Sequence, residues 1–151
     1  MATPTKPLPE VLDEKTIRLA ISINADAIQQ EYIELPSTRY KFTRRHIASA
    51  KAHRLAELED EIEEQKIRAD LKRVADEANP PKKLTVADME QIVILDPRYR
   101  QSKERVINAR EAMDQAAAIV ASISDKKEML VSLGADLRTE KEADPSIRTR
   151  R

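Results

Sequence analysis

The sequence predicts an all-α protein, and its composition and the placement of its prolines support this. The 151 residues include one Gly, and 36% are charged whereas 3% are aromatic. Ala, Glu, Lys, Arg and Leu dominate, as is typical of long helices and coiled coils. The prolines are concentrated at the ends and in the connections. We expect two long helices in an antiparallel, coiled-coil-like hairpin, joined by a short helix and preceded by an N-terminal helix.

The chain length predicts one helical domain with a thin core. We expect a flexible N-terminus over residues 1–10, a single helical domain over 11–139 and a flexible charged tail over 140–151. Large apolar residues are few for a chain of this length, so the domain is expected to complete its burial by forming a homo-oligomer.

Apolar residues at helical spacing predict a first helix from about Asp13 to Leu35, which Pro36 should end. Ser37 or Thr38 is suited to cap a second helix that runs to about Asn79. This helix of about 40 residues would span roughly 60 Å. Its predicted apolar stripe consists of Ile47, Ala48, Ala52, Leu55, Leu58, Ile62, Ile67, Leu71, Val74 and Ala78.

Two details of the second helix follow from this stripe. The spacing slips between Ile62 and Ile67, as a coiled-coil stutter would. Tyr40 falls on the apolar stripe, and Phe42 falls on the opposite, polar face together with Arg39, His46 and His53.

A short helix is predicted to end near Leu95, with Thr85 and Asp88 placed as a capping box. Asp96 followed by Pro97 is typical of a helix N-terminus. The last helix should run from Pro97 to about Thr139, with Gly134 as a weak point or a close backbone contact. Its two heptad seams are Tyr99, Val106, Met113 and Val120, and Ala109, Ala116, Ile123, Leu130 and Leu137.

Charge is sorted along the second helix, although the whole chain is formally neutral. Residues 39–54, here called the basic segment, hold six Arg or Lys, two His, two aromatic residues and no acid. The acidic segment, residues 57–64, follows with six Asp or Glu. A basic run with aromatic residues suits a phosphate backbone with bases to stack on. The acidic segment indicates self-limited binding or docking against another subunit's basic segment.

Two interpretations of the basic segment remain open. In the first, its cations contact the phosphates of single-stranded DNA, while Phe42 and Tyr40 stack on bases. In the second, the segment is a solvated helix face whose long side chains cover the core seam. The candidate nucleic-acid-binding residues are Arg39, Tyr40, Lys41, Phe42, Arg44, Arg45, Lys51 and Arg54.

Other classes of function receive no support from the sequence. There is no Cys, no Gly-rich phosphate loop and no evident nucleophile with its base, so we expect neither an enzyme nor a cofactor. The acidic segment and the two histidines lack the spacing of a metal site. The N-terminus does not resemble a signal peptide, and no stretch approaches the ~20 apolar residues of a membrane span. We expect a cytoplasmic protein with no membrane contact.

From Lys83 onward the order of residues resembles that of the phage UvsY-type recombination mediators and their small phage relatives. The resemblance covers roughly residues 30–138, including the long helix that turns from basic to acidic. Its motifs are Lys83-x-Thr85, then Val93-x-x-Asp96-x-x-Tyr99, and finally Met129-Leu130-x-x-Leu133-Gly134-x-x-Leu137-Arg138.

The resemblance implies a ring of identical subunits that binds single-stranded DNA in a phage-infected bacterial host. Such proteins assist a RecA-like recombinase in replacing single-strand-binding protein on the DNA. The basic segment would supply the contacts, with Lys82, Lys83, Arg98 and Arg100 as secondary candidates. This chain departs from the family's pattern because it lacks Trp. The alternative function is a helical protein-interaction module, such as a scaffold, an adaptor or a phage-encoded inhibitor of a host enzyme.

Overall fold

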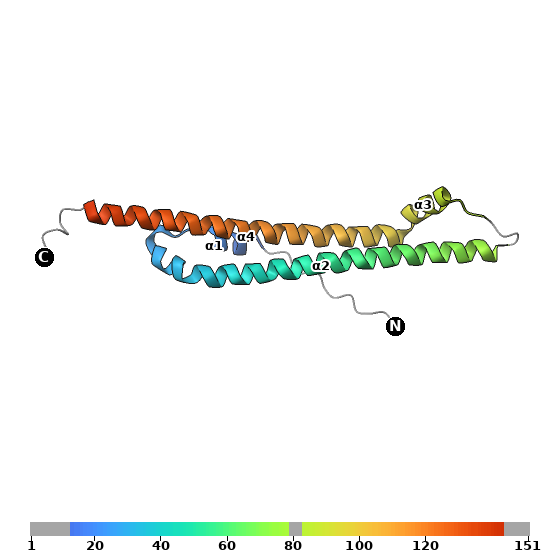
Figure 1. The fold of residues 1–151 in the computed structure, drawn as a ribbon, viewed down its shortest axis with the longest axis horizontal. Coiled ribbons are helices and arrows are strands. Elements are labelled where there is room, and N and C mark those ends of the chain that lie inside the picture. The colour runs from blue at the N-terminus through green and yellow to red at the C-terminus, as the bar shows by residue number, and fades with distance from the viewer. Residues whose placement is uncertain (1–12, 79–82, 144–151) are drawn as a thin grey trace. The chain divides into compact units, whose positions relative to one another are not determined.

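The computed structural model describes residues 13–78 and 83–143, and within these ranges it contains helices and no strand. The helices are α1 (Glu14–Ile21), α2 (Ile28–Glu77), α3 (Val86–Leu95) and α4 (Pro97–Ala143), with a 3₁₀ turn η1 (Ala25–Ala27) before α2 (Figure 1). The predicted all-helical class, with long helices packed together, is confirmed. The predicted flexible N-terminus (1–10), the predicted end of the second helix at about Asn79 and most of the predicted tail (144–151) lie outside the described residues.

The chain divides into two compact units. Of the described residues, unit 1 contains Ile47–Asp114, and unit 2 contains residues 13–46 and 115–143. The long helices α2 and α4 each contribute one part to each unit.

The first helix and Pro36 differ from the sequence prediction. Helix α1 ends at Ile21, and α2 begins at Ile28 and continues through Pro36. A proline inside a helix removes one backbone hydrogen bond and costs about 3 kcal/mol. Burial of Leu35 in the core of unit 2 helps to offset this cost. Figure 1 shows α2 bending within its first turns, as expected near a proline.

Of the predicted helix caps, the one at Ser37 is wrong, whereas those at Thr85 and Asp96 are confirmed. Ser37 does not cap a helix, because its hydroxyl donates to the carbonyl oxygen of Glu34 inside α2 at 2.8 Å. The capping box of α3 is confirmed: the Asp88 amide donates to Thr85 Oγ1, and the Thr85 amide donates to Asp88 Oδ2, both at 3.2 Å. Asp96 caps α4 by accepting the Arg98 amide at 2.8 Å. Arg98 also lowers the pKa of the Asp96 carboxyl through side-chain and backbone hydrogen bonds.

The core of unit 2 is apolar and joins α1, α2 and α4. Its buried residues are Ala20, Leu35, Phe42, Ile119, Ile123 and Leu130. Ile17, Ile21, Ile23, Ile28 and Val120 pack against them. The first helix therefore packs within its own chain in this structure.

A buried lysine fastens α1 to this core. Lys126 is 6% exposed, and its Nζ donates to the Ala20 carbonyl oxygen at 3.3 Å, near the C-terminal end of α1. The same Nζ lies 2.5 Å from Glu31 Oε2. Both the charge and the donor are therefore satisfied, as a buried ammonium requires.

The core of unit 1 is narrower and partly polar. Its fully buried side chains include Ser49, Ile67 and Val93, with Ala56 and Ala109 also buried. Asp60 of α2 meets Ser102 and Lys103 of α4, whereas Asp70, later in α2, meets Arg98, earlier in α4. This order shows that α2 and α4 run antiparallel in unit 1. Because the buried Ser49, Ala56 and Ala109 are small, the backbones of α2 and α4 can approach closely.

The seams of α4 are largely as predicted. Ala109, Ala116, Ile123 and Leu130 are buried, and Tyr99, Val106, Met113 and Val120 are half-buried. Leu137 is 41% exposed, so the seam ends before it. A Cβ added at Gly134 would lie 3.8 Å from the Tyr32 ring, which is an ordinary van der Waals distance. The predicted close backbone contact is therefore not found at Gly134, and the position would accommodate alanine.

The predicted face of α2 is wrong as far as Ile62 and, apart from Val74, correct from Ile67, beyond which Leu71 and Ala78 are half-buried. Of the predicted stripe, Ile47, Leu55, Leu58, Ile62 and Val74 are all exposed, whereas Ile67 is fully buried. The helix instead packs with the opposite face, on which Leu35, Phe42, Ser49 and Ala56 repeat every seven residues. The slip between Ile62 and Ile67 is therefore a change of face rather than a stutter.

Phe42 should behave as a core residue, because it is 4% exposed within the apolar cluster of unit 2. We expect Phe42→Ala to lower the free energy of unfolding by about 3–5 kcal/mol. Tyr40→Ala, at a 65% exposed position on the same helix, should change it by less than about 1 kcal/mol. Urea denaturation followed by circular dichroism measures both. Equal losses for the two variants would contradict this packing.

Candidate nucleic-acid interface

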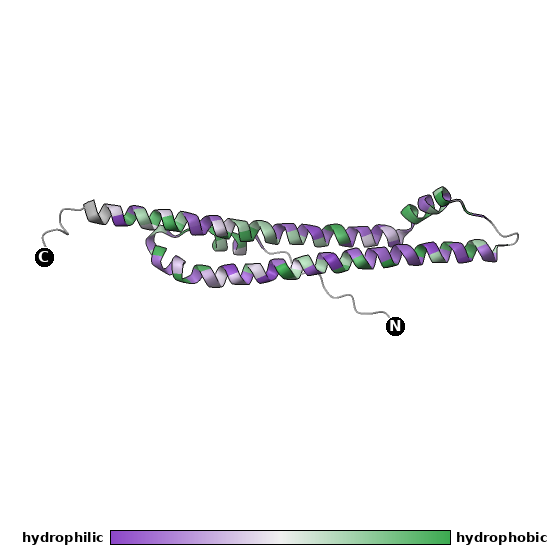
Figure 2. Cartoon of the chain, in the orientation of Figure 1, coloured by the Kyte–Doolittle hydropathy of each residue, from purple (hydrophilic) through white to green (hydrophobic). Residues whose placement is uncertain are grey.

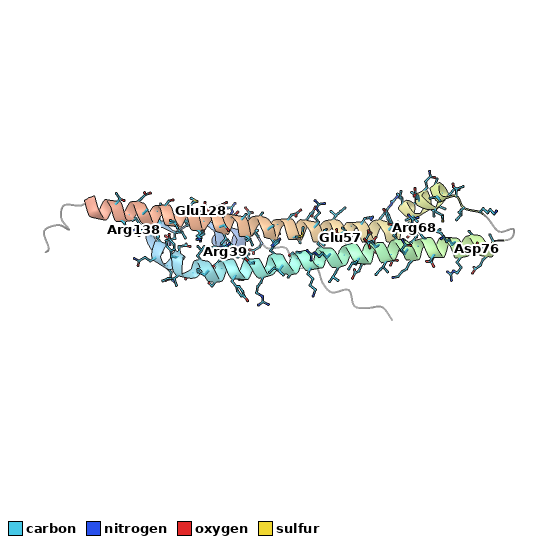
Figure 3. The ribbon with its side chains drawn as sticks, viewed as in Figure 1. Arg39, Glu57, Arg68, Asp76, Glu128 and Arg138 are labelled. Atoms are coloured by element: carbon cyan, nitrogen blue, oxygen red, sulfur yellow. The ribbon has the colours of Figure 1, made fainter. Side chains whose placement is uncertain are left out.

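The basic segment lies wholly within α2, where most of its charges are exposed. In unit 2, Arg39, Lys41 and Arg44 are exposed and Arg45 is half-buried. In unit 1, Lys51 and Arg54 are exposed. Figure 3 labels Arg39 and Glu57 along α2, one in the basic and one in the acidic segment. The helix thus presents the predicted cations to solvent on several sides.

The six cations of the basic segment have no ion-pair partner within the described parts of the chain. Elsewhere pairing is common: Arg68 binds Glu64 at 2.9 Å and Lys66 lies 3.2 Å from Glu63. The segment's positive charge is therefore not neutralised by neighbouring carboxylates. Such a charge attracts a polyanion or a carboxylate-rich surface.

The two aromatic residues of the segment have exchanged the positions that the sequence predicted. Phe42 is buried in the core, so its ring is not available to a base in this structure. Tyr40 is 65% exposed, and the Arg44 guanidinium carbon lies 5.9 Å from the centre of its ring. The seven-residue repeat through Leu35, Phe42, Ser49 and Ala56 is the signal that sequence reasoning missed. An exposed aromatic ring and an exposed cation therefore lie side by side on unit 2.

The histidines and the secondary candidate residues differ from the basic segment in how far they are exposed and paired. His53 is largely buried, and its Nε2 lies 3.7 Å from Glu57 Oε1. Arg98 is engaged by Asp96 and Asp70, both at 3.0 Å. Lys83 and Arg100 are exposed, and Lys82 is outside the described residues. Within the described ranges no three His, Asp or Glu side chains gather to hold a metal ion.

The acidic segment is divided between the interior and the surface. Asp60 is 7% exposed; its Oδ1 lies 2.7 Å from Ser102 Oγ and its Oδ2 2.6 Å from Lys103 Nζ. The hydrogen bond that Lys103 Nζ donates to Asp60 raises the pKa of Lys103. Its contribution to stability is complete below the ordinary lysine pKa and is lost as the pH rises through the raised one. Glu57, Glu59 and Glu61 remain exposed.

No family model, curated protein or solved structure matches this chain. In the part of the chain that the structure describes, no helix combines the length and the apolar character needed to cross a membrane.

Asp60 and Glu61 should differ sharply in their effect on stability, although they are neighbours in the acidic segment. Asp60→Ala should lower the free energy of unfolding by about 1–3 kcal/mol, because it removes the buried acceptor of Ser102 and Lys103. Glu61→Ala, at an exposed position, should change it by less than about 0.5 kcal/mol. Thermal unfolding at neutral pH checks both variants, and similar losses would argue against the buried network.

Proposed function

We propose that the chain is a single-stranded DNA-binding recombination mediator that acts as a homo-oligomer. In this role it assists the loading of a RecA-like recombinase in place of single-strand-binding protein. The observation that carries the proposal is the run of six Arg and Lys side chains that lack ion-pair partners within the described residues. The layout of residues 30–138, which resembles the UvsY-type mediators, supports the biological role.

The exposed groups of unit 2 suit a single strand. Lys41 and Arg44, three residues apart on α2, offer charges to neighbouring phosphates, and Tyr40, four residues before Arg44, offers a ring on which a base can stack. One stacked base contributes about 1–3 kcal/mol. A single copy therefore binds weakly, and a homo-oligomer multiplies these contacts through effective concentration. Many weak contacts suit a protein that must hold DNA and then release it to a recombinase.

The second candidate is a helical protein-interaction module, and the apolar surface of α3 favours it. Val86, Ile94 and Leu95 are 55–65% exposed, while Val93 alone is buried among the residues of this helix. Figure 2 shows the hydrophobic colouring of much of α3. Exposed apolar helices of this kind mark surfaces for partner proteins. A scaffold or an inhibitor of a host enzyme would use α3 and would need no DNA.

Removing two exposed cations should weaken DNA binding without unfolding the chain. We expect Lys41→Ala with Arg44→Ala to reduce affinity for a labelled single strand of about 30 nucleotides. The slope of log K against log salt should become shallower by about 0.7 for each lost phosphate contact. Fluorescence anisotropy at two or more salt concentrations measures both effects.

The matched control removes two neighbouring exposed cations from the other end of the same helix, Lys72→Ala with Arg73→Ala. It should retain affinity and slope. Absence of salt-sensitive binding by the wild-type protein would contradict the proposal and favour the protein-interaction module. Equal losses in both double variants would remove the basic segment as the site.

Stacking on Tyr40 gives a separate expectation. Tyr40→Ala should weaken single-strand binding by about 1–3 kcal/mol, whereas Tyr40→Phe should retain it because the ring remains. The same anisotropy titration distinguishes them. Identical affinities for the alanine and phenylalanine variants would exclude base stacking at this position.

A further inference from the structure

An apolar stripe runs along α2 in unit 1 on the face turned away from α4. This outer stripe consists of Ile47, Leu55, Leu58 and Ile62, which are 62%, 46%, 55% and 55% exposed. Leu55, Leu58 and Ile62 follow the three-four spacing of a coiled-coil seam. Asp60, two residues from both Leu58 and Ile62, faces α4, so those two side chains point in the opposite direction. Large aliphatic residues in such a row indicate a helical partner.

Charges of opposite sign lie along the outer stripe on either side of its centre. Lys51 and Arg54 lie before its centre, and Glu59 and Glu61 lie after it. All four are exposed, and none forms an ion pair with another described residue. One face of one helix thus carries an apolar centre, a basic end and an acidic end.

We propose that the outer stripe binds the outer stripe of a second copy of this chain, with the two α2 helices antiparallel. A two-fold axis between Leu55 and Leu58 places Leu55 of each copy against Leu58 of the other. Lys51 then lies against Ile62 of the second copy, with its aliphatic stem on the apolar residue and its ammonium in solvent.

The order of the charges along α2 favours a second copy of this chain as the partner, and it favours antiparallel α2 helices. In the antiparallel arrangement Arg54 of each copy lies near Glu61 of the other, which forms two equivalent ion pairs. A parallel pairing would instead set basic segment beside basic segment, and like charges across an interface are costly. Each copy carries both the basic and the acidic residues that pair across this surface. Such self-complementarity is the property of a two-fold interface between identical copies.

The inference deepens the proposed function, because it rests on the assembly of identical subunits and names the surface that makes it. It leaves DNA binding to other residues, chiefly those of the basic segment in unit 2. Assembly is measured without DNA, so failure of one does not decide the other. Intact assembly with no affinity for DNA would contradict the proposed function and leave this interface standing.

Disruption and charge-swap rescue test the interface in the full-length protein. Light scattering after size exclusion should give the wild type at least twice the mass of a single chain. Leu58→Asp, and separately Arg54→Glu, should lower that mass while circular dichroism shows unchanged helicity. Arg54→Glu combined with Glu61→Arg should restore it, because the two ion pairs reform with reversed sign.

The control is Ile107→Asp, because Ile107 of α4 is 57% exposed, as Leu58 is 55% exposed, but lies outside the outer stripe. It should keep the wild-type mass. A monomeric wild type, a Leu58→Asp variant of unchanged mass, or a double variant that fails to recover would each overturn the proposal.

Disulfide cross-linking tests the direction, since the chain has no Cys of its own. An equimolar mixture of Lys51→Cys and Ile62→Cys chains should give cross-linked heterodimers under oxidation. Lys51→Cys alone should not cross-link, because in the antiparallel pair its two copies lie about 16 Å apart along the helices, beyond the ~7 Å Cα separation that a disulfide spans. Efficient cross-linking of Lys51→Cys alone would show a parallel pair and overturn the arrangement.

Discussion

The face of α2 that packs on α4 determines most of what this molecule offers to partners. A long helix beside one other helix buries only a narrow stripe. Here that stripe includes Phe42 in unit 2 and Ala56, Asp60 and Ile67 in unit 1. Much of the remaining surface of α2 is exposed, including most of the cations of the basic segment and the larger aliphatic residues of unit 1. The basic segment and the outer stripe are both available to partners because α2 packs on α4 with this face.

The buried face prevails although it is poorer in large apolar residues. In unit 1 its Ser49 and Ala56 are small, as is Ala109 of α4, so the two backbones can approach closely. The buried carboxylate of Asp60 would be costly alone, but Ser102 and Lys103 satisfy it. Lys126 is satisfied in the same way in unit 2, by Glu31 and a backbone carbonyl. Polar groups with matched partners thus specify which residues of α2 and α4 meet.

This explains which elements could be predicted from the sequence. The apolar residues of α4 fall on two regular seven-residue repeats, so the sequence correctly predicts Ala109, Ile123 and Leu130 as part of a buried seam. In α2 most large apolar residues of unit 1 lie on the exposed face, and a buried Ser49 and Asp60 conceal the true repeat. The sequence prediction therefore places Tyr40 on the packed face and Phe42 on the exposed face, the reverse of what the structure shows. The rule that a proline ends a helix also fails at Pro36. Burial of Leu35 before it and of Phe42 after it outweighs the loss of one backbone hydrogen bond.

The two proposed surfaces divide the basic segment between them. If the outer stripe is covered by a second copy, Arg54 pairs with that copy's Glu61 and Lys51 lies against its Ile62, so both add little to DNA binding. The cations left for phosphates are then those of unit 2: Arg39, Lys41, Arg44 and Arg45. Each added copy brings the same group again, so affinity would rise with the number of subunits rather than with the charge of one. The acidic segment, which repels DNA in a single chain, would in the assembly instead hold two copies together.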